Sequence, residues 1–156
     1  KQFVQNEINF WQKKYDKAPN QTSFLSLLAS NYSKLFENTR DIKNIYKAEE
    51  LLLKVNEAYH YSEVGPIRSL GRNYITQHRF KEALVLANKA LNIGEGMKQT
   101  QKLLFDVNME LGNYDAAKLN LKAIDDKNDI ELEAFRKTLL EALKKGQSEY
   151  ENVFKD

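Results

Sequence analysis

Apolar residues recur along most of the chain at spacings of three and four positions, the pattern of helices with one buried face. Residues 1–17 carry Ile8, Trp11 and Tyr15 at this spacing and run into Pro19. The glycines of residues 92–96 are suited to end a helix, and residues 128–131 resemble a helix start with a cap and a glutamate. The pattern predicts an all-α chain of about eight helices.

The apolar pattern also repeats after 34 residues, which is the length of one helix–turn–helix unit. The matched pairs are Leu70 with Leu104, Phe80 with Tyr114, Ala83 with Ala117, Ala87 with Leu121 and Ala90 with Ile124. Small residues such as Gly71 and Ala83 let two helix backbones approach closely, and bulky neighbours fill the grooves between them. We therefore expect helix pairs that pack in series.

Within these units the first and second helices each keep a fixed spacing. First helices show Ile67, Leu70, Gly71 and Tyr74, and again Leu25, Leu28, Ala29 and Tyr32. Second helices show Ala83, Ala87 and Ala90, then Ala48, Leu52 and Val55, and Ala117, Leu121 and Ile124. On these residues the chain resembles the tetratricopeptide-repeat family over most of its length. The resemblance implies a right-handed superhelical solenoid of antiparallel helix pairs.

The resemblance divides one domain, residues 1–156, into successive parts. It implies a half repeat at 1–19, a repeat with an insertion at 22–58, regular repeats at 64–93 and 98–124, and a capping helix with a tail at 129–156. The repeat at 98–124 departs from the family pattern, because Gln101, Phe105 and Asn108 stand where aromatic, small and aromatic residues are typical. Trp11 lies in an end helix, where it either packs inward or serves as an exposed anchor for a neighbour.

In this family the first helices line the concave wall that binds partners, and the resemblance places a set of side chains there. The implied wall residues are Ser26, Ser30, Ser33, Arg68, Arg72, Ile75, Lys102, Asp106, Met109, Arg136 and Leu140. Arg68, Lys102 and Arg136 follow one another at intervals of 34 residues. Arg68 and Arg72 are one turn apart and can form a fork for a carboxylate or phosphate, whereas Asp106 is spaced to pair with Lys102. The alternative is that these charges are solvated on an open helix face.

The composition excludes several kinds of binding and catalytic sites. The chain has 24 basic and 22 acidic residues and a net charge of +2, a smaller excess than nucleic-acid-binding domains usually carry. It has no cysteine, which excludes disulfides, thiolate zinc sites and cysteine nucleophiles. His60 and His78 lack the spacing of a metal site, and we interpret both as exposed residues of a turn or helix end. Residues 94–100 lack the Gly-Lys-Ser/Thr ending of a phosphate loop, and residues 125–129 lack the glycine of a calcium loop.

We therefore predict a protein- or peptide-binding scaffold for acidic or C-terminal segments, with no enzymatic activity, cofactor or metal. The alternatives are an RNA-binding helical-repeat protein, or an accessory module of a larger enzyme or assembly. No apolar run reaches the length of a membrane span. Residues 46–58 and 111–124 weakly resemble repeat proteins of bacterial envelopes, including lipid-anchored ones. That resemblance favours the periplasm or envelope over the cytoplasm, and a start at Lys1 without Met is compatible with a targeting segment removed ahead of it.

Overall fold

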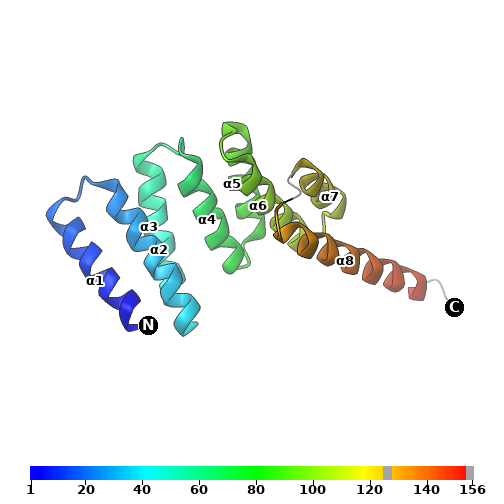
Figure 1. The fold of residues 1–156 in the computed structure, drawn as a ribbon, viewed down its shortest axis with the longest axis horizontal. Helices are drawn as coiled ribbons and strands as arrows, with labels where there is room; N and C mark the ends of the chain where they lie inside the picture. The colour runs from blue at the N-terminus through cyan, green and yellow to red at the C-terminus, as the bar shows by residue number, and fades with distance from the viewer. Residues whose placement is uncertain (125–127, 154–156) are drawn as a thin grey trace. The chain divides into compact units, whose positions relative to one another are not determined.

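The computed structural model describes residues 1–124 and 128–153, with side chains described through residue 146 outside that gap. The described residues form eight α-helices and no strand (Figure 1). The helices are α1 (Gln2–Lys17), α2 (Thr22–Thr39), α3 (Lys43–Ala58), α4 (Val64–Thr76), α5 (Phe80–Ile93), α6 (Met97–Glu110), α7 (Tyr114–Ala123) and α8 (Glu131–Val153). This confirms the predicted all-α class and the expected number of helices. Across the described ranges, no helix has both the length and the hydrophobicity that a membrane span requires.

The chain divides into two compact units, Lys1–Glu95 with α1 to α5 and Gly96–Asp156 with α6 to α8. In the first unit each helix packs on the next one along the chain, most extensively α2 on α3 and α4 on α5 (Figure 1). In the second unit α6 packs on α7, and α7 packs on α8. The pairs α2–α3, α4–α5 and α6–α7 span residues 22–58, 64–93 and 97–123, where the sequence predicts paired helices.

The core of the first unit combines alanines with larger aliphatic side chains. The alanines take positions where a larger side chain would hold two helices apart, and the aliphatic residues fill the space between them. The hydrophobic residues of this unit with at most 1% exposure are Leu28, Ala29, Ala48, Val55, Ile67, Leu70, Ala83, Ala87 and Ala90. All of them occupy the repeat positions described above. Trp11 is half-buried, and its ring lies 5.8 Å from that of Phe24, so it packs against α2.

Turns between these helices use left-handed backbone conformations. Arg40 (φ 58°) follows α2, His60 (φ 54°) follows α3, and His78 (φ 58°) lies between α4 and α5. Gly94 (φ 90°) ends α5, which confirms the helix stop predicted at residues 92–96. Both histidines are exposed, as predicted, and the ring of His78 stacks on Phe80.

Two buried asparagines connect α3 to α4. The Asn56 amide donates to the Pro66 carbonyl at 3.1 Å and to Leu52 of its own helix at 3.0 Å. The Asn73 amide donates to the Ile45 carbonyl at 3.0 Å. Because Asn56 lies late in α3 and Ile45 lies early in it, these bonds fix both ends of α3 against α4.

An aromatic stack fills the core of the second unit. Phe105 of α6 is buried, and its ring lies 5.0 Å from that of Phe135 in α8. The other buried members are Ala117, Leu121, Ile124, Leu132 and Leu139. The resemblance drawn from the sequence implied a small residue at position 105; the structure has a large ring there, and α8 supplies the surface against which it packs.

Candidate functional site

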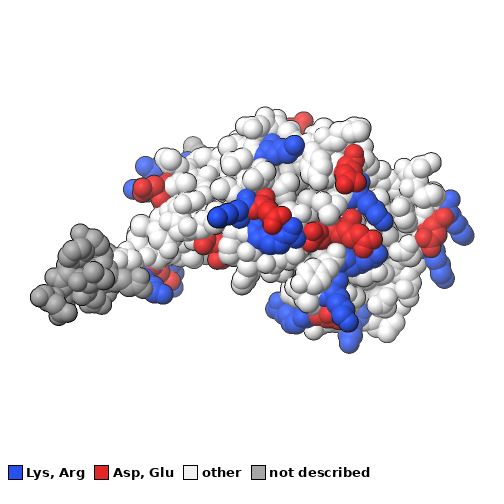
Figure 2. All heavy atoms as spheres, turned by 180° about the vertical axis from the view of Figure 1, so that it is seen from behind, with Lys and Arg blue, Asp and Glu red and all other residues white. Residues whose placement is uncertain are grey.

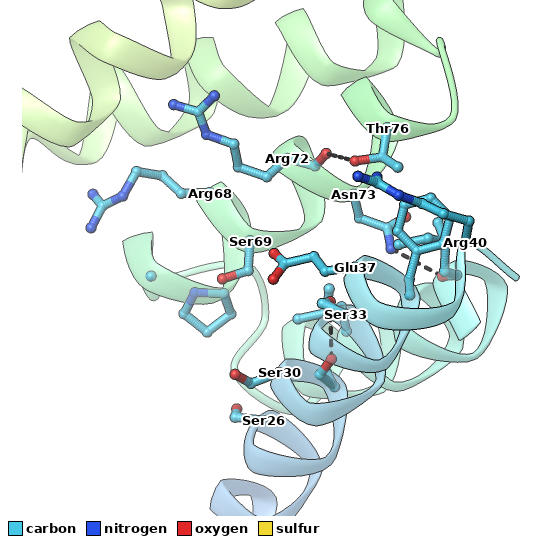
Figure 3. Close-up of a pocket in the computed structure, with 16 residues that line it drawn as sticks. Ser26, Ser30, Ser33, Glu37, Arg40, Arg68, Ser69, Arg72, Asn73 and Thr76 are labelled. Atoms are coloured by element: carbon cyan, nitrogen blue, oxygen red, sulfur yellow. Dashed lines mark hydrogen bonds between the residues drawn. The ribbon is translucent and has the colours of Figure 1, made fainter. Parts of the chain in front are cut away.

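A pocket of about 790 Å³ lies in the first unit, between α2 and α4 (Figure 3). We call it the α2–α4 pocket, and its volume is within the range of about 300–1,000 Å³ typical of ligand sites. It is lined by Ser26, Ala29, Ser30, Ser33, Phe36, Glu37, Arg40, Ile45, Leu52, Gly65, Pro66, Arg68, Ser69, Arg72, Asn73 and Thr76. Buried side chains of α3, Ile45 and Leu52, make its apolar floor.

The α2 wall is a row of small polar side chains. Ser26, Ser30 and Ser33 are spaced by four and three residues, so they share one face of the helix. The hydroxyl of Ser33 donates to the Ala29 carbonyl at 3.0 Å, which leaves its oxygen available as an acceptor. The wall can therefore donate and accept hydrogen bonds while taking up little volume.

The α4 wall carries two of the predicted arginines. Arg68 is half-buried, and its Nη1 donates to the Glu95 carbonyl at 3.3 Å, while Arg72 is exposed. In Figure 3 both guanidinium groups extend away from α2, so they lie along the rim of the pocket beyond its serine row. Ser69 lines the pocket from the same helix, and Thr76 donates from its hydroxyl to the Arg72 carbonyl at 3.2 Å.

Two further charges come from the end of α2. Glu37 extends toward α4 on the side of Ser69 in Figure 3. Arg40, the residue that ends α2, places its guanidinium 5.7 Å from the centre of the Phe36 ring. The pocket thus combines three arginines with one glutamate, and its charge is mixed, with an excess of positive groups.

The structure brings together the sequence-predicted residues of α2 and α4. Ser26, Ser30, Ser33, Arg68 and Arg72 all line the α2–α4 pocket. Ile75 is a half-buried residue of α4 and is not among the pocket's lining residues. The other predicted wall residues, Lys102, Asp106, Met109, Arg136 and Leu140, belong to the second unit.

Lys102 is held within the second unit by two carboxylates. Its side chain is 10% exposed, and its Nζ lies 2.8 Å from Asp129 and 3.1 Å from Glu131. Lys98 adds a second ammonium 3.0 Å from Asp129. The hydrogen bond to Asp129 is the main reason that the pKa of Lys102 is raised, against the opposing effect of burial. The charge of Lys102 therefore stabilises the start of α8. Its spacing in the sequence had indicated Asp106 as a partner and not these two carboxylates.

The remaining predicted residues of the second unit lie in different surroundings. Arg136 and Leu140 are exposed on α8, and Arg136 is paired with Glu133 of its own helix. Asp106 is half-buried on α6. Met109 lines a separate pocket of about 400 Å³ together with Tyr114, Ala142 and other residues of the second unit.

Charged side chains outside the pocket form ion pairs in both units. Arg79 binds Glu49 at 2.9 Å and Glu82 at 2.6 Å, and these bonds raise its pKa above the usual value. Figure 2 shows basic and acidic side chains beside one another on one face of the molecule. This mixture differs from the one-sided basic surface of a typical RNA-binding domain.

Within the described ranges, no group of three or more histidines, aspartates or glutamates is arranged to hold a metal ion.

Sequence reasoning did not identify Glu37, Arg40, Ser69 and Thr76 as pocket residues. Helical periodicity contained a signal for two of them, because Glu37 follows Ser33 by four residues and Thr76 follows Arg72 by four. The family resemblance did not extend to Glu37, because α2 has 18 residues where the regular first helix α4 has 13. The insertion expected at 22–58 thus continues the helix and adds a charged residue to its wall.

Searches against protein-family models and against curated proteins find no match for the chain. No role can therefore be assigned to the pocket residues by comparison with a related protein. Their own geometry and chemistry are the basis for assigning a function.

Proposed function

We propose that the chain is a peptide-binding scaffold without catalytic activity, and that its α2–α4 pocket binds an acidic or C-terminal peptide segment. The observation that carries the proposal is the meeting of Arg68 and Arg72 with the serine row of α2 around a single pocket. We also propose a tetratricopeptide-like solenoid for the fold. The repeat of 34 residues and the pairing of α2 with α3, α4 with α5 and α6 with α7 support it.

The chemistry of the two walls suits an extended peptide. Serine and threonine hydroxyls donate and accept hydrogen bonds, so they match the alternating N–H and C=O groups of a peptide backbone. Arginine binds a carboxylate through two parallel hydrogen bonds, stronger than those between neutral groups. The small serine side chains leave room for the ligand, and Ile45 and Leu52 offer an apolar surface beneath it.

The test measures the affinity of labelled acidic octapeptides with a free C-terminal carboxylate by fluorescence anisotropy. We expect the double variant Arg68→Glu and Arg72→Glu to bind at least about tenfold more weakly, because charged hydrogen bonds contribute roughly 1.5–3 kcal/mol. Affinity for the unmodified protein should also fall as salt is raised. The variant Ser30→Trp, which fills the pocket without changing its charge, should weaken binding as well.

The matched control is the double variant Lys34→Glu and Lys81→Glu. It makes the same change in net charge at exposed lysines outside the pocket and should bind as the unmodified protein does. Circular dichroism verifies that each variant keeps its helices. The proposal that the pocket binds acidic peptides would be contradicted by equal affinity of the arginine and control variants, or by an affinity that is independent of salt. Tight binding of random RNA in a gel shift, with no binding of peptides, would favour the RNA-binding alternative.

A further inference from the structure

Glu37 is an acidic side chain on the wall of a mainly basic pocket. It is exposed, and it extends into the α2–α4 pocket on the side of Ser69 (Figure 3). Among the residues that the structure describes, no cation is within ion-pair distance of its carboxylate. Other glutamates do have such partners, including Glu49 with Arg79 and Glu133 with Arg136.

Two basic residues, Lys34 and Arg40, lie three positions from Glu37, and the position of Arg40 explains why it does not neutralise that carboxylate. Residues three apart on a helix commonly form ion pairs. Arg40, however, lies beyond the last helical residue, and its φ of 58° takes it out of helical register. Its guanidinium lies over the Phe36 ring instead. The carboxylate of Glu37 therefore remains directed at the pocket.

We infer that Glu37 is a cation subsite, so that the peptide bound in the α2–α4 pocket carries a lysine side chain next to its acidic residues. This inference rests on the proposed function of the pocket. An ammonium group can donate three hydrogen bonds, and the carboxylate of Glu37 and the hydroxyl oxygens of Ser33 and Ser69 can accept them. Carboxylates on either side of the lysine then meet the arginines of the rim and of the α2 end.

The same carboxylate disfavours a uniformly acidic ligand. A peptide or nucleic-acid backbone with negative groups along its whole length places one of them against Glu37, and like charges at close range repel. A mixed-charge segment avoids this repulsion and gains an ion pair. Glu37 thus acts on specificity, whereas the arginines supply attraction for any anionic ligand.

The experiment compares two acetylated pentapeptides, Glu-Glu-Lys-Glu-Glu and Glu-Glu-Gln-Glu-Glu, by fluorescence anisotropy on the full chain. We expect the unmodified protein to prefer the lysine peptide by about fivefold, the upper range for a solvent-accessible ion pair. In Glu37→Gln the preference should disappear, and in Glu37→Lys it should reverse in favour of the glutamine peptide. The control Glu57→Gln, at an exposed glutamate of α3 outside the pocket, should keep the full preference.

The outcomes separate this inference from the proposed function. Equal binding of both peptides, weakened by the double variant Arg68→Glu and Arg72→Glu, overturns the cation subsite and leaves the acidic-peptide pocket in place. A lysine preference that persists in Glu37→Gln also overturns the subsite. If neither peptide binds the unmodified protein, both proposals fail.

Discussion

The ionised carboxylate of Asp129 is stabilised by several contacts within the second unit. Its side chain is 4% exposed and faces the ammonium groups of Lys102 and Lys98, while its other oxygen accepts the backbone N–H of Glu131 at 3.0 Å. The hydrogen bond from Lys102, followed by those from Lys98 and the Glu131 backbone, holds the pKa of the Asp129 carboxyl well below its usual range. The cluster therefore makes the start of α8 sensitive to acid.

The sign of this dependence follows from the lowered pKa. An unfolded aspartate titrates near pH ~3.9, so below that pH the unfolded chain takes up a proton that folded Asp129 does not. We expect the stabilisation from Asp129 to be present above pH ~4 and to be lost as the pH falls toward the folded pKa. Asp129→Asn should lower the urea midpoint at neutral pH, and its deficit should shrink in acid.

The control is Asp16→Asn, at an exposed carboxylate near the end of α1. It should leave the urea midpoint nearly unchanged at neutral pH. A deficit of Asp129→Asn that stays constant down to strongly acidic pH would contradict the assigned role of the carboxylate.

These residues show where sequence reasoning succeeds and where it ends. The face shared by Ser26, Ser30 and Ser33 follows from helical periodicity alone, and the structure places all three on one pocket wall. The ion pairs of Lys102 do not follow, because Asp129 lies 27 positions away and reaches it only through the packing of α8. Local spacing predicts which side of a helix a residue occupies, and tertiary contacts decide what it meets there.

The helices were predictable because their apolar spacing and their ends are local properties. The start of α8 shows how closely a local pattern locates a helix boundary. The sequence indicated a capped start within residues 128–131, and the helix begins at Glu131 with Asp129 accepting its backbone N–H. The greater length of α2 could not be predicted as such. The sequence showed only that residues 22–58 contain more residues than the other units, and extra residues can extend either a helix or a turn.

Two glycines with open surroundings should respond oppositely to alanine. Gly146 lies within α8 and Gly94 has a φ of 90° at the end of α5, and an added Cβ meets no atom within 4 Å at either site. We expect Gly146→Ala to raise the free energy of unfolding by up to about 1 kcal/mol, because alanine favours the helix. Gly94→Ala should lower it by about 1–2 kcal/mol, because the left-handed conformation is strained for alanine.

Urea unfolding followed by circular dichroism measures both changes. Each variant serves as the control for the other, since both add the same methyl group to open space. Shifts of the same sign would show that backbone conformation is not the deciding factor at these positions.

The α2–α4 pocket belongs entirely to the first unit. All of its lining residues fall between Ser26 and Thr76, within Lys1–Glu95. That unit has its own buried core from α1 to α5. Binding and the fold of this unit should therefore be independent of residues 96–156.

We expect a fragment of residues 1–95 to unfold cooperatively and to bind the acidic octapeptides with the affinity of the full chain. Chains of this size bury enough surface to fold alone. Thermal unfolding followed by circular dichroism and fluorescence anisotropy measure the two properties. A fragment that melts without a cooperative transition would contradict the independence of the first unit, and a folded fragment that binds more weakly would place part of the site elsewhere.

The paired amide bonds of Asn56 and Asn73 have a consequence for binding thermodynamics. Apolar side chains alone allow helices to slide by small steps, whereas directional bonds at both ends of α3 hold α4 at one axial position. The α4 wall is therefore fixed against α3, which carries the floor of the pocket, before any ligand arrives. A preorganised receptor loses little conformational entropy on association, so the cost of ordering falls on the ligand, and shortening or stiffening that ligand is the direct route to higher affinity.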